Sequence, residues 1–262
     1  MHELTPGFTH IEEFVNLESL SDDSVDSYLE KIRNFEADYR SDIFLDEAQQ
    51  AILEPTLSRL DRVQSFVGHG NFNLLGFDEM LHFARNYPEI GAFTPAELNF
   101  LEAIFAADAS TYGFFGSKVT STMTATVPIS TVVKIAGSGH YLFKGSSLAR
   151  YEHLRKDVGE QLLLTSGVRN VVKQMHLFLA KTRLSSGNLS KASRSLAPPG
   201  YSFHGVGDFD VGKAGLGGRN FTADFSQTLE FKQMIKLGYV DLRYTDTNTE
   251  GVRFEPWHIK IA

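Results

Sequence analysis

The stretch "GYSFHGVGDFDVG", residues 200–212, is the part of the sequence that decides which kind of domain the chain forms. It places one histidine, two aspartates and four glycines within thirteen positions. The glycines let the backbone turn so that His204 and Asp210 can both point inward. A neutral imidazole and a carboxylate are suitable donors for a catalytic zinc ion, which usually takes three protein ligands. A glycine-rich surface turn with an incidental histidine remains the alternative.

The carboxyl end supplies a second pattern of the same kind, "EPWHI" at residues 255–259. Glu255 and His258 lie three positions apart beside the only tryptophan. Metal-assisted hydrolysis needs a histidine that binds the ion and a carboxylate that takes a proton from water. The alternative is a terminal strand that buries Trp257 and leaves the glutamate in solvent. Because the sequence has no cysteine, any metal must be held by histidines and carboxylates, and disulfides are excluded.

Three blocks of the sequence together resemble a known family. They are "SGVRNVVKQ" (166–174), "SFHGVGDFD" (202–210) and "EPWH" (255–258). In order and rough spacing they are similar to the signature blocks of the zinc D-alanyl-D-alanine carboxypeptidase and dipeptidase family. That family acts on bacterial cell-wall peptides and shares its metal site with the hedgehog-like fold. Its blocks read S-G-Y-R with a later glutamine, S-x-H-x-x-G-x-A-x-D, and E-x-W-H. The resemblance covers roughly residues 125–262.

The resemblance implies a role for each matching residue. It makes His204, Asp210 and His258 the zinc ligands and Glu255 the general base. Arg169 matches the arginine that stabilises negative charge on the substrate. The remaining matches imply supporting residues of the substrate pocket, namely Ser166, Gln174, Ser202 and Trp257.

The sequence also departs from the family pattern. A valine replaces the usual tyrosine of the first block, and Phe209 stands near the small alanine position of the second. The second block is one residue short, so that His204 to Asp210 spans six positions where the family pattern has seven. Asp208 is therefore an alternative ligand. Asp210 is preferred because Val211 follows it, as an apolar residue follows the family aspartate.

The texture of the sequence changes near residue 115, from helical periodicity to segments rich in threonine and valine. In "TPAELNFLEAIFAAD", Thr94 and Glu97 form a capping-box pattern with Pro95 at the first helical position. Helices are expected over 22–39, 46–67, 77–87, 94–108, 146–160, 171–184 and 224–237, strands over 118–129, 131–137, 140–143 and 161–167, and a loop over 185–207.

These segments predict an α+β fold in which a small antiparallel sheet with flanking helices carries the zinc site, after an all-helical N-terminal region. The predicted division is an acidic helical accessory domain, 1–115, and a zinc peptidase catalytic domain, 116–262.

Charge is distributed unevenly along the chain. Residues 1–110 carry a net charge of −15 and residues 111–262 a net charge of +8, giving −7 in total. We interpret this as two solvated surfaces of opposite sign that attract each other, with an anionic polymer facing the basic half as the alternative. Nucleic acid is not expected, because lysine and arginine are scattered. No apolar run is long enough for a membrane span, and "MHELTPGFTHIEEF" at the start has no leader-like pattern.

The resemblance implies a zinc metallopeptidase that hydrolyses a D-amino-acid-containing peptide bond of bacterial peptidoglycan, as a D,D-carboxypeptidase or an endopeptidase. The implied partner is a peptidoglycan peptide. The implied location is the periplasm, the cell envelope or the extracellular space. The alternative is a non-catalytic metal-binding or cell-wall-binding protein with a hedgehog-like domain. Glu255 favours the enzyme, since a protein that only binds could most readily lose that residue.

Overall fold

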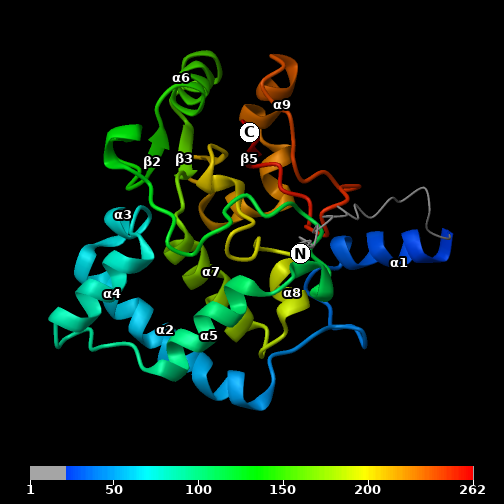
Figure 1. The fold of residues 1–262 in the computed structure, drawn as a ribbon. Helices are drawn as coiled ribbons and strands as arrows, with labels where there is room; N and C mark the ends of the chain where they lie inside the picture. Colours follow the sequence, from blue (N-terminus) through cyan, green and yellow to red (C-terminus); the bar gives the residue numbers. More distant parts are fainter. Residues whose placement is uncertain (1–21, 262) are drawn as a thin grey trace, which may run out of the picture.

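A computed structural model describes residues 22–261, and Figure 1 shows two lobes. The amino-terminal stretch tested for a leader lies outside the described residues. The helices are α1 (Asp22–Arg33), α2 (Glu47–Val67), α3 (His69–Phe72), α4 (Phe77–Asn86), α5 (Pro95–Ala106), α6 (Ser146–Val158), α7 (Val171–Leu184), α8 (Leu189–Ser193) and α9 (Leu229–Lys236). The strands are β1 (Val132–Lys134), β2 (Tyr141–Phe143), β3 (Leu162–Ser166), β4 (Phe209–Lys213) and β5 (His258–Ile259).

The helical lobe is built around α2, α5 and α7. The predicted capping box is present: the Thr94 hydroxyl accepts from the Glu97 amide, and the Glu97 carboxylate accepts from the Thr94 amide. The apolar face of each helix enters one common core, whose fully buried members include Leu57, Leu60, Val63, Leu101, Phe178 and Leu179. Helix α7 thus packs with helices that precede residue 115 in the sequence. The division into domains at residue 115 stays a prediction.

The second lobe contains a three-stranded antiparallel sheet in the order β3-β4-β5. Its register pairs Ser166 with Asp210 and Asp210 with His258, after a β-bulge between Leu164 and Ser166. Residues directly opposite each other on neighbouring strands project from the same face of a sheet. The register therefore lines up a serine, an aspartate and a histidine from segments that are far apart in the sequence.

The apolar core of this lobe lies under the opposite face of β4. Side chains alternate along a strand, so Phe209 and Val211 enter a core with residues of α6 and α9, while Asp210 between them faces the other way. Neither Phe209 nor Val211 has any exposed surface. Alternation within β4 thus separates the apolar core from the polar site.

The α+β class predicted from the sequence is confirmed, but two local predictions are wrong. Residues 118–129 contain no strand and none of them is buried. Their threonines and valines have high strand propensity, but no strand among the described residues pairs with them. Conversely, the predicted loop 185–207 contains α8, which begins with the Asn188 side chain accepting from the Lys191 amide. The predicted helix at 224–237 starts as a 3-10 turn, η6 (Ala223–Gln227), before α9.

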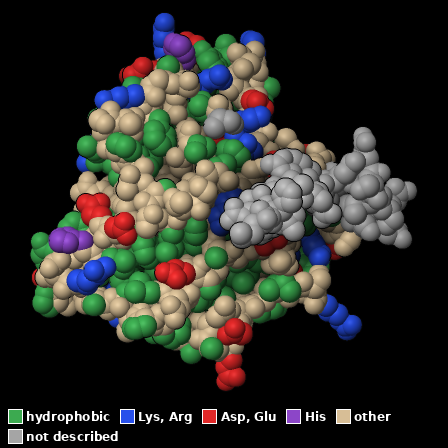
Figure 2. Space-filling model, viewed as in Figure 1, with side chains coloured by type: hydrophobic (Ala, Val, Ile, Leu, Met, Phe, Trp, Pro, Cys, Tyr) green, Lys and Arg blue, Asp and Glu red, His purple; other side chains and the backbone are tan. Residues whose placement is uncertain are grey.

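Charged side chains do not gather into one patch of either sign on the face shown in Figure 2. Within residues 22–261, no helix combines the length and the hydropathy that crossing a bilayer would need.

Candidate active site

Three segments bring the predicted metal ligands together. His204 lies in the 3-10 turn η4 (Phe203–Gly205), Asp210 in β4 and His258 in β5. Each offers a ligand atom, and these atoms all lie within 4.8 Å of one another. All three residues are 2% exposed. Because buried polar side chains need partners, this cluster forms a network in which each ring orientation is set by its neighbours.

The His204 ring is oriented by the backbone. Its Nδ1 lies 2.8 Å from the carbonyl oxygen of Gly167, which can only accept, so Nδ1 carries the proton. The lone pair of Nε2 then points toward Asp210, whose Oδ1 is 3.3 Å away. Burial and the neighbouring charge of Arg169 lower the pKa of His204 to about 4. His204 is therefore neutral at physiological pH, as a metal ligand must be.

The His258 ring lies between two carboxylates. Its Nε2 is 2.9 Å from Oδ2 of Asp208, and its Nδ1 is 3.1 Å from Oδ1 of Asp210. Burial alone would lower the pKa of His258, but the hydrogen bonds to these carboxylates raise it to about 9. A metal ion bound at Nδ1 would have to displace the proton there.

The distances from Asp210 to the two histidines are close to those of a tetrahedral zinc site. Two atoms bonded to one zinc ion at 2.0–2.1 Å lie about 3.3–3.4 Å apart. Oδ1 of Asp210 is 3.3 Å from His204 Nε2 and 3.1 Å from His258 Nδ1. Burial opposes ionisation of Asp210, but His204, His258 and Arg169 keep the pKa of its carboxyl well below the usual range. The donor set, two imidazoles and one ionised carboxylate, suits zinc.

Arg169 directly contacts the same cluster. Its Nη2 donates to Oδ2 of Asp210 at 2.8 Å and lies 2.6 Å from His204 Nε2. Ser166 Oγ accepts from its Nε at 2.9 Å, and Gln174 Oε1 accepts from its Nη1 at 3.3 Å. Ser166, Arg169 and Gln174 of the first block thus form one hydrogen-bonded unit around the guanidinium. Since His204 Nε2 has one lone pair, a metal bound there requires the arginine to withdraw from that nitrogen but not from Asp210.

Glu255 lies in the segment that leads into β5. Its backbone amide donates to the carbonyl of Tyr244 at 3.0 Å, and its side chain is 3.7 Å from the guanidinium of Arg253. Burial, reinforced by the charge of Asp210 and opposed by Arg253, raises the pKa of the Glu255 carboxyl to about 7. A carboxylate with a pKa near 7 can both accept and return a proton at neutral pH.

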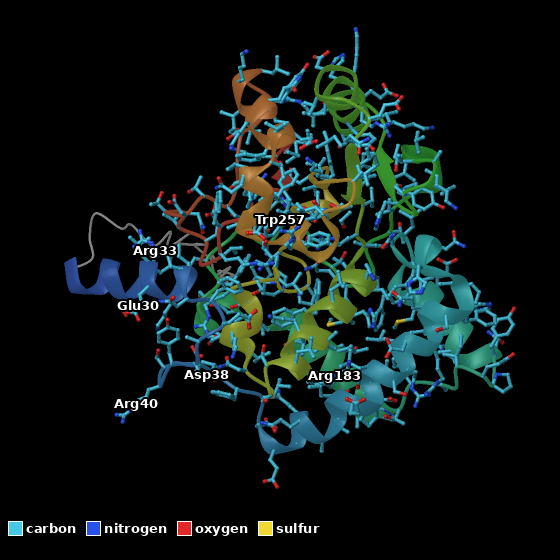
Figure 3. All side chains as sticks on the ribbon, turned by 180° about the vertical axis from the view of Figure 1, so that it is seen from behind. Glu30, Arg33, Asp38, Arg40, Arg183 and Trp257 are labelled. Atoms are coloured by element: carbon cyan, nitrogen blue, oxygen red, sulfur yellow. The ribbon has the colours of Figure 1, made fainter. Side chains whose placement is uncertain are left out.

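A cleft of about 390 Å³ lies over the cluster. The predicted pocket residues Ser166, Ser202 and Trp257 line it, and so do the three candidate ligands. Gln174 is not among its lining residues and acts through Arg169. Figure 3 places Trp257 near the middle of the molecule, while the labelled side chains of α1 lie at the periphery. The guanidinium carbon of Arg253 lies over the indole ring of Trp257, 4.9 Å from the ring centroid.

Sequence reasoning did not find several residues of this site. Lys173 and Ser195 line the cleft, and the buried Ser195 hydroxyl has no hydrogen-bond partner. Tyr244 contributes a ring 5.1 Å from that of His258. Asp208, considered only as an alternative ligand, contacts the far side of His258 instead. Of these residues, Lys173 and Asp208 lie within the three blocks, whereas Ser195 and Tyr244 lie outside them and no sequence signal marked either one.

Comparisons with known proteins agree with the blocks. The model of the family "VanY: D-alanyl-D-alanine carboxypeptidase" matches residues 146–261. No curated protein sequence matches the chain. Among solved structures, the LdcB LD-carboxypeptidase has 22% identity over 49% of this chain with a TM-score of 0.41, and this chain covers 62% of its length.

Two further solved structures are similar at the same level. The D,D-pentapeptidase VanY of a VanB-type vancomycin resistance cassette, in complex with Zn(II), has 20% identity over 48% of this chain and 75% of its own, with a TM-score of 0.40. VanYB in complex with D-alanine-D-alanine has 22% identity over 48% and 74%, with a TM-score of 0.39. The family model spans all three blocks that form the cluster. Residues 146–261 of this chain therefore form a region that matches the model of the VanY D-alanyl-D-alanine carboxypeptidase family.

Proposed function

We propose that the chain is a zinc-dependent peptidase that hydrolyses a D-amino-acid-containing peptide bond at the carboxyl end of a peptidoglycan stem peptide. The observation that supports this most directly is the convergence of His204, Asp210 and His258, with a carboxylate of raised pKa, Glu255, on the same cleft. The family model that covers these residues supports the same activity. An enzyme with this substrate class works outside the cytoplasm.

The proposed roles follow from the contacts. His204 Nε2, Asp210 Oδ1 and His258 Nδ1 would hold the ion. When bound, zinc supplies Lewis acidity to a water molecule and to the carbonyl group of the substrate. Glu255 takes the proton from the attacking water and returns it to the departing amine, since its pKa lies near neutrality.

Arg169 supplies positive charge beside the reacting carbonyl. Ser166, Gln174 and Asp210 fix its guanidinium on three sides. A fixed donor of this kind contributes on the order of 3 kcal/mol to stabilising an oxyanion. Trp257 and Ser202 form part of the cleft wall against which the peptide would lie.

The test combines metal analysis with product analysis. The purified protein is loaded with zinc and incubated with muropeptides that end in D-Ala-D-Ala, or in a single D-Ala. We expect one zinc per chain and release of D-alanine from one of the two substrates, detected by mass spectrometry. His204→Ala and His258→Ala should each lose stoichiometric zinc, because two ligands are too few. Full zinc content in both variants, or zinc-loaded protein that releases no amino acid, would contradict the proposal.

A further inference from the structure

Asp208 lies directly before β4 and is buried. Both oxygens of its carboxylate accept hydrogen bonds. Its Oδ2 accepts from His258 Nε2 at 2.9 Å and from Arg243 Nε at 2.8 Å. Its Oδ1 accepts from the backbone amide of Ile261 at 2.7 Å. The residue is 1% exposed. Asp208 thus connects three segments, the loop after His204, the segment before Glu255 and the end of β5.

The contact with His258 fixes which ring nitrogen faces the ligand cluster. Because Asp208 accepts from Nε2, that nitrogen is the one that keeps its proton once the ring is neutral, and the lone pair is then on Nδ1. The same hydrogen bond opposes rotation of the ring about its Cβ–Cγ bond. A carboxylate behind a metal-binding histidine also raises the basicity of the nitrogen that faces the ion.

Arg243 extends this support to the other histidine. Its guanidinium carbon lies 3.4 Å from the ring centroid of Phe203, the residue before His204. Its side chain is 10% exposed, so the ion pair with Asp208 is largely shielded from water. One carboxylate and one guanidinium therefore contact the segments that carry both histidines.

The position of Asp208 is related to the second block, which is one residue shorter than the family pattern. In the family pattern an alanine lies two positions before the aspartate ligand, and counted back from Asp210 that position falls on Asp208. The two aspartates are two residues apart, a spacing at which side chains project from the same face of an extended chain. The missing residue thus puts a second carboxylate beside the first, within reach of His258.

We propose that Asp208 is a positioning residue for the metal site: it orients His258 with Nδ1 toward the ion and is itself fixed by Arg243 and the Ile261 amide. The inference rests on the proposed zinc site. It differs from the ligand assignment because Asp208 acts through His258 and does not contact the ion.

The experiment measures zinc affinity by competition with a chromophoric chelator for the full chain and for Asp208→Ala and Asp208→Asn. Alanine is the residue that the family pattern has two positions before its aspartate. Loss of a carboxylate behind a metal-bound histidine typically weakens binding 10- to 100-fold, and we expect a loss in this range for Asp208→Ala. Asn keeps an acceptor for Nε2, so Asp208→Asn should lose less. In the zinc-loaded protein, the His258 Nε2 proton should give a slowly exchanging NMR signal that only the alanine variant loses.

Glu97→Gln is the matched control. Glu97 is also 1% exposed and pairs with an arginine, Arg59, at 3.0 Å, but it lies in the helical lobe. This variant should lower thermal stability and leave zinc affinity and the histidine signal unchanged. Wild-type affinity in Asp208→Ala would overturn the positioning role while the zinc site stands. Absence of zinc binding by the wild-type chain would overturn the site and the positioning role together.

Discussion

The two lobes bury different chemistry. In residues 45–114 of the helical lobe and in α7, the buried acidic or histidine side chains are Glu97 and His176, and the core consists mainly of leucines, phenylalanines and other apolar residues. The sheet lobe buries five ionisable side chains around one point: His204, Asp208, Asp210, Glu255 and His258. Apolar burial stabilises at about 25 cal/mol per Å² regardless of pH, whereas buried charges depend on every partner. We therefore expect the two lobes to respond to different perturbations.

The largest expected effect is the loss of turnover in Glu255→Gln. This change keeps the shape of the side chain and removes its basicity, so the turnover number should fall about 100- to 10,000-fold. Zinc content, measured by elemental analysis, should stay at the wild-type value. Zinc lost together with activity would make Glu255 a ligand and erase the distinction between the base and the metal cluster.

The converse perturbation is Leu57→Ala in α2. Leu57 is 1% exposed in the helical core, and truncating such a side chain costs about 2–5 kcal/mol of unfolding free energy. Urea denaturation should show this loss, while zinc affinity stays unchanged. Leu57→Met, which conserves volume, is the control and should cost less than about 1.5 kcal/mol. A zinc affinity that falls in step with stability would show that the lobes do not respond separately.

Arg169→Lys tests the charged side of the site. A lysine keeps the positive charge but cannot bond Ser166, Gln174 and Asp210 at once, because it lacks the planar fork. We expect normal folding and zinc content, with kcat/KM reduced more than tenfold. A lower kcat points to the oxyanion, and a higher KM points to a carboxylate of the substrate. Unchanged kinetics would return Arg169 to a structural role.

The smallest expected effect is a pH dependence of stability in the metal-free protein. Folding raises the pKa of Glu255 to about 7, so between about pH 4.5 and 7 the folded chain holds more protons than the unfolded chain. This group therefore lowers stability as pH rises through that window. Glu255→Gln should raise the midpoint of thermal unfolding at pH 8 and change it little at pH 4. An equal shift at both pH values would assign the effect to packing rather than to the buried charge.

The elements that the sequence predicted well are those specified by local chemistry. The run "VVKQMHLFLAKTRL" forms α7 from Val171 to Leu184, and the Thr94 and Glu97 pair caps α5 as expected. The candidate ligands were found because three blocks match a family pattern in order. In each case the signal lies within a few neighbouring residues.

The rest depends on contacts between distant segments. The register that sets Asp210 opposite both Ser166 and His258 is a property of the folded sheet, and β4 itself was hidden in a glycine-rich stretch that reads as a turn. Arg243 lies 35 positions from Asp208 with no motif around it. The threonines of residues 118–129 have strand propensity but no partner strand, and propensity alone cannot supply one.

Helix α7 limits how the region that the family model matches can be used in engineering. Its Gln174 supports Arg169 in the site, while Met175, Phe178 and Leu179 are buried among the helices that precede residue 115. A fragment trimmed to the region that the family model matches would expose this face to solvent, and exposed apolar patches of this kind promote aggregation. Fusions or minimised versions of the protein should therefore keep α2, α4 and α5, even though none of them contributes a proposed catalytic residue or metal ligand.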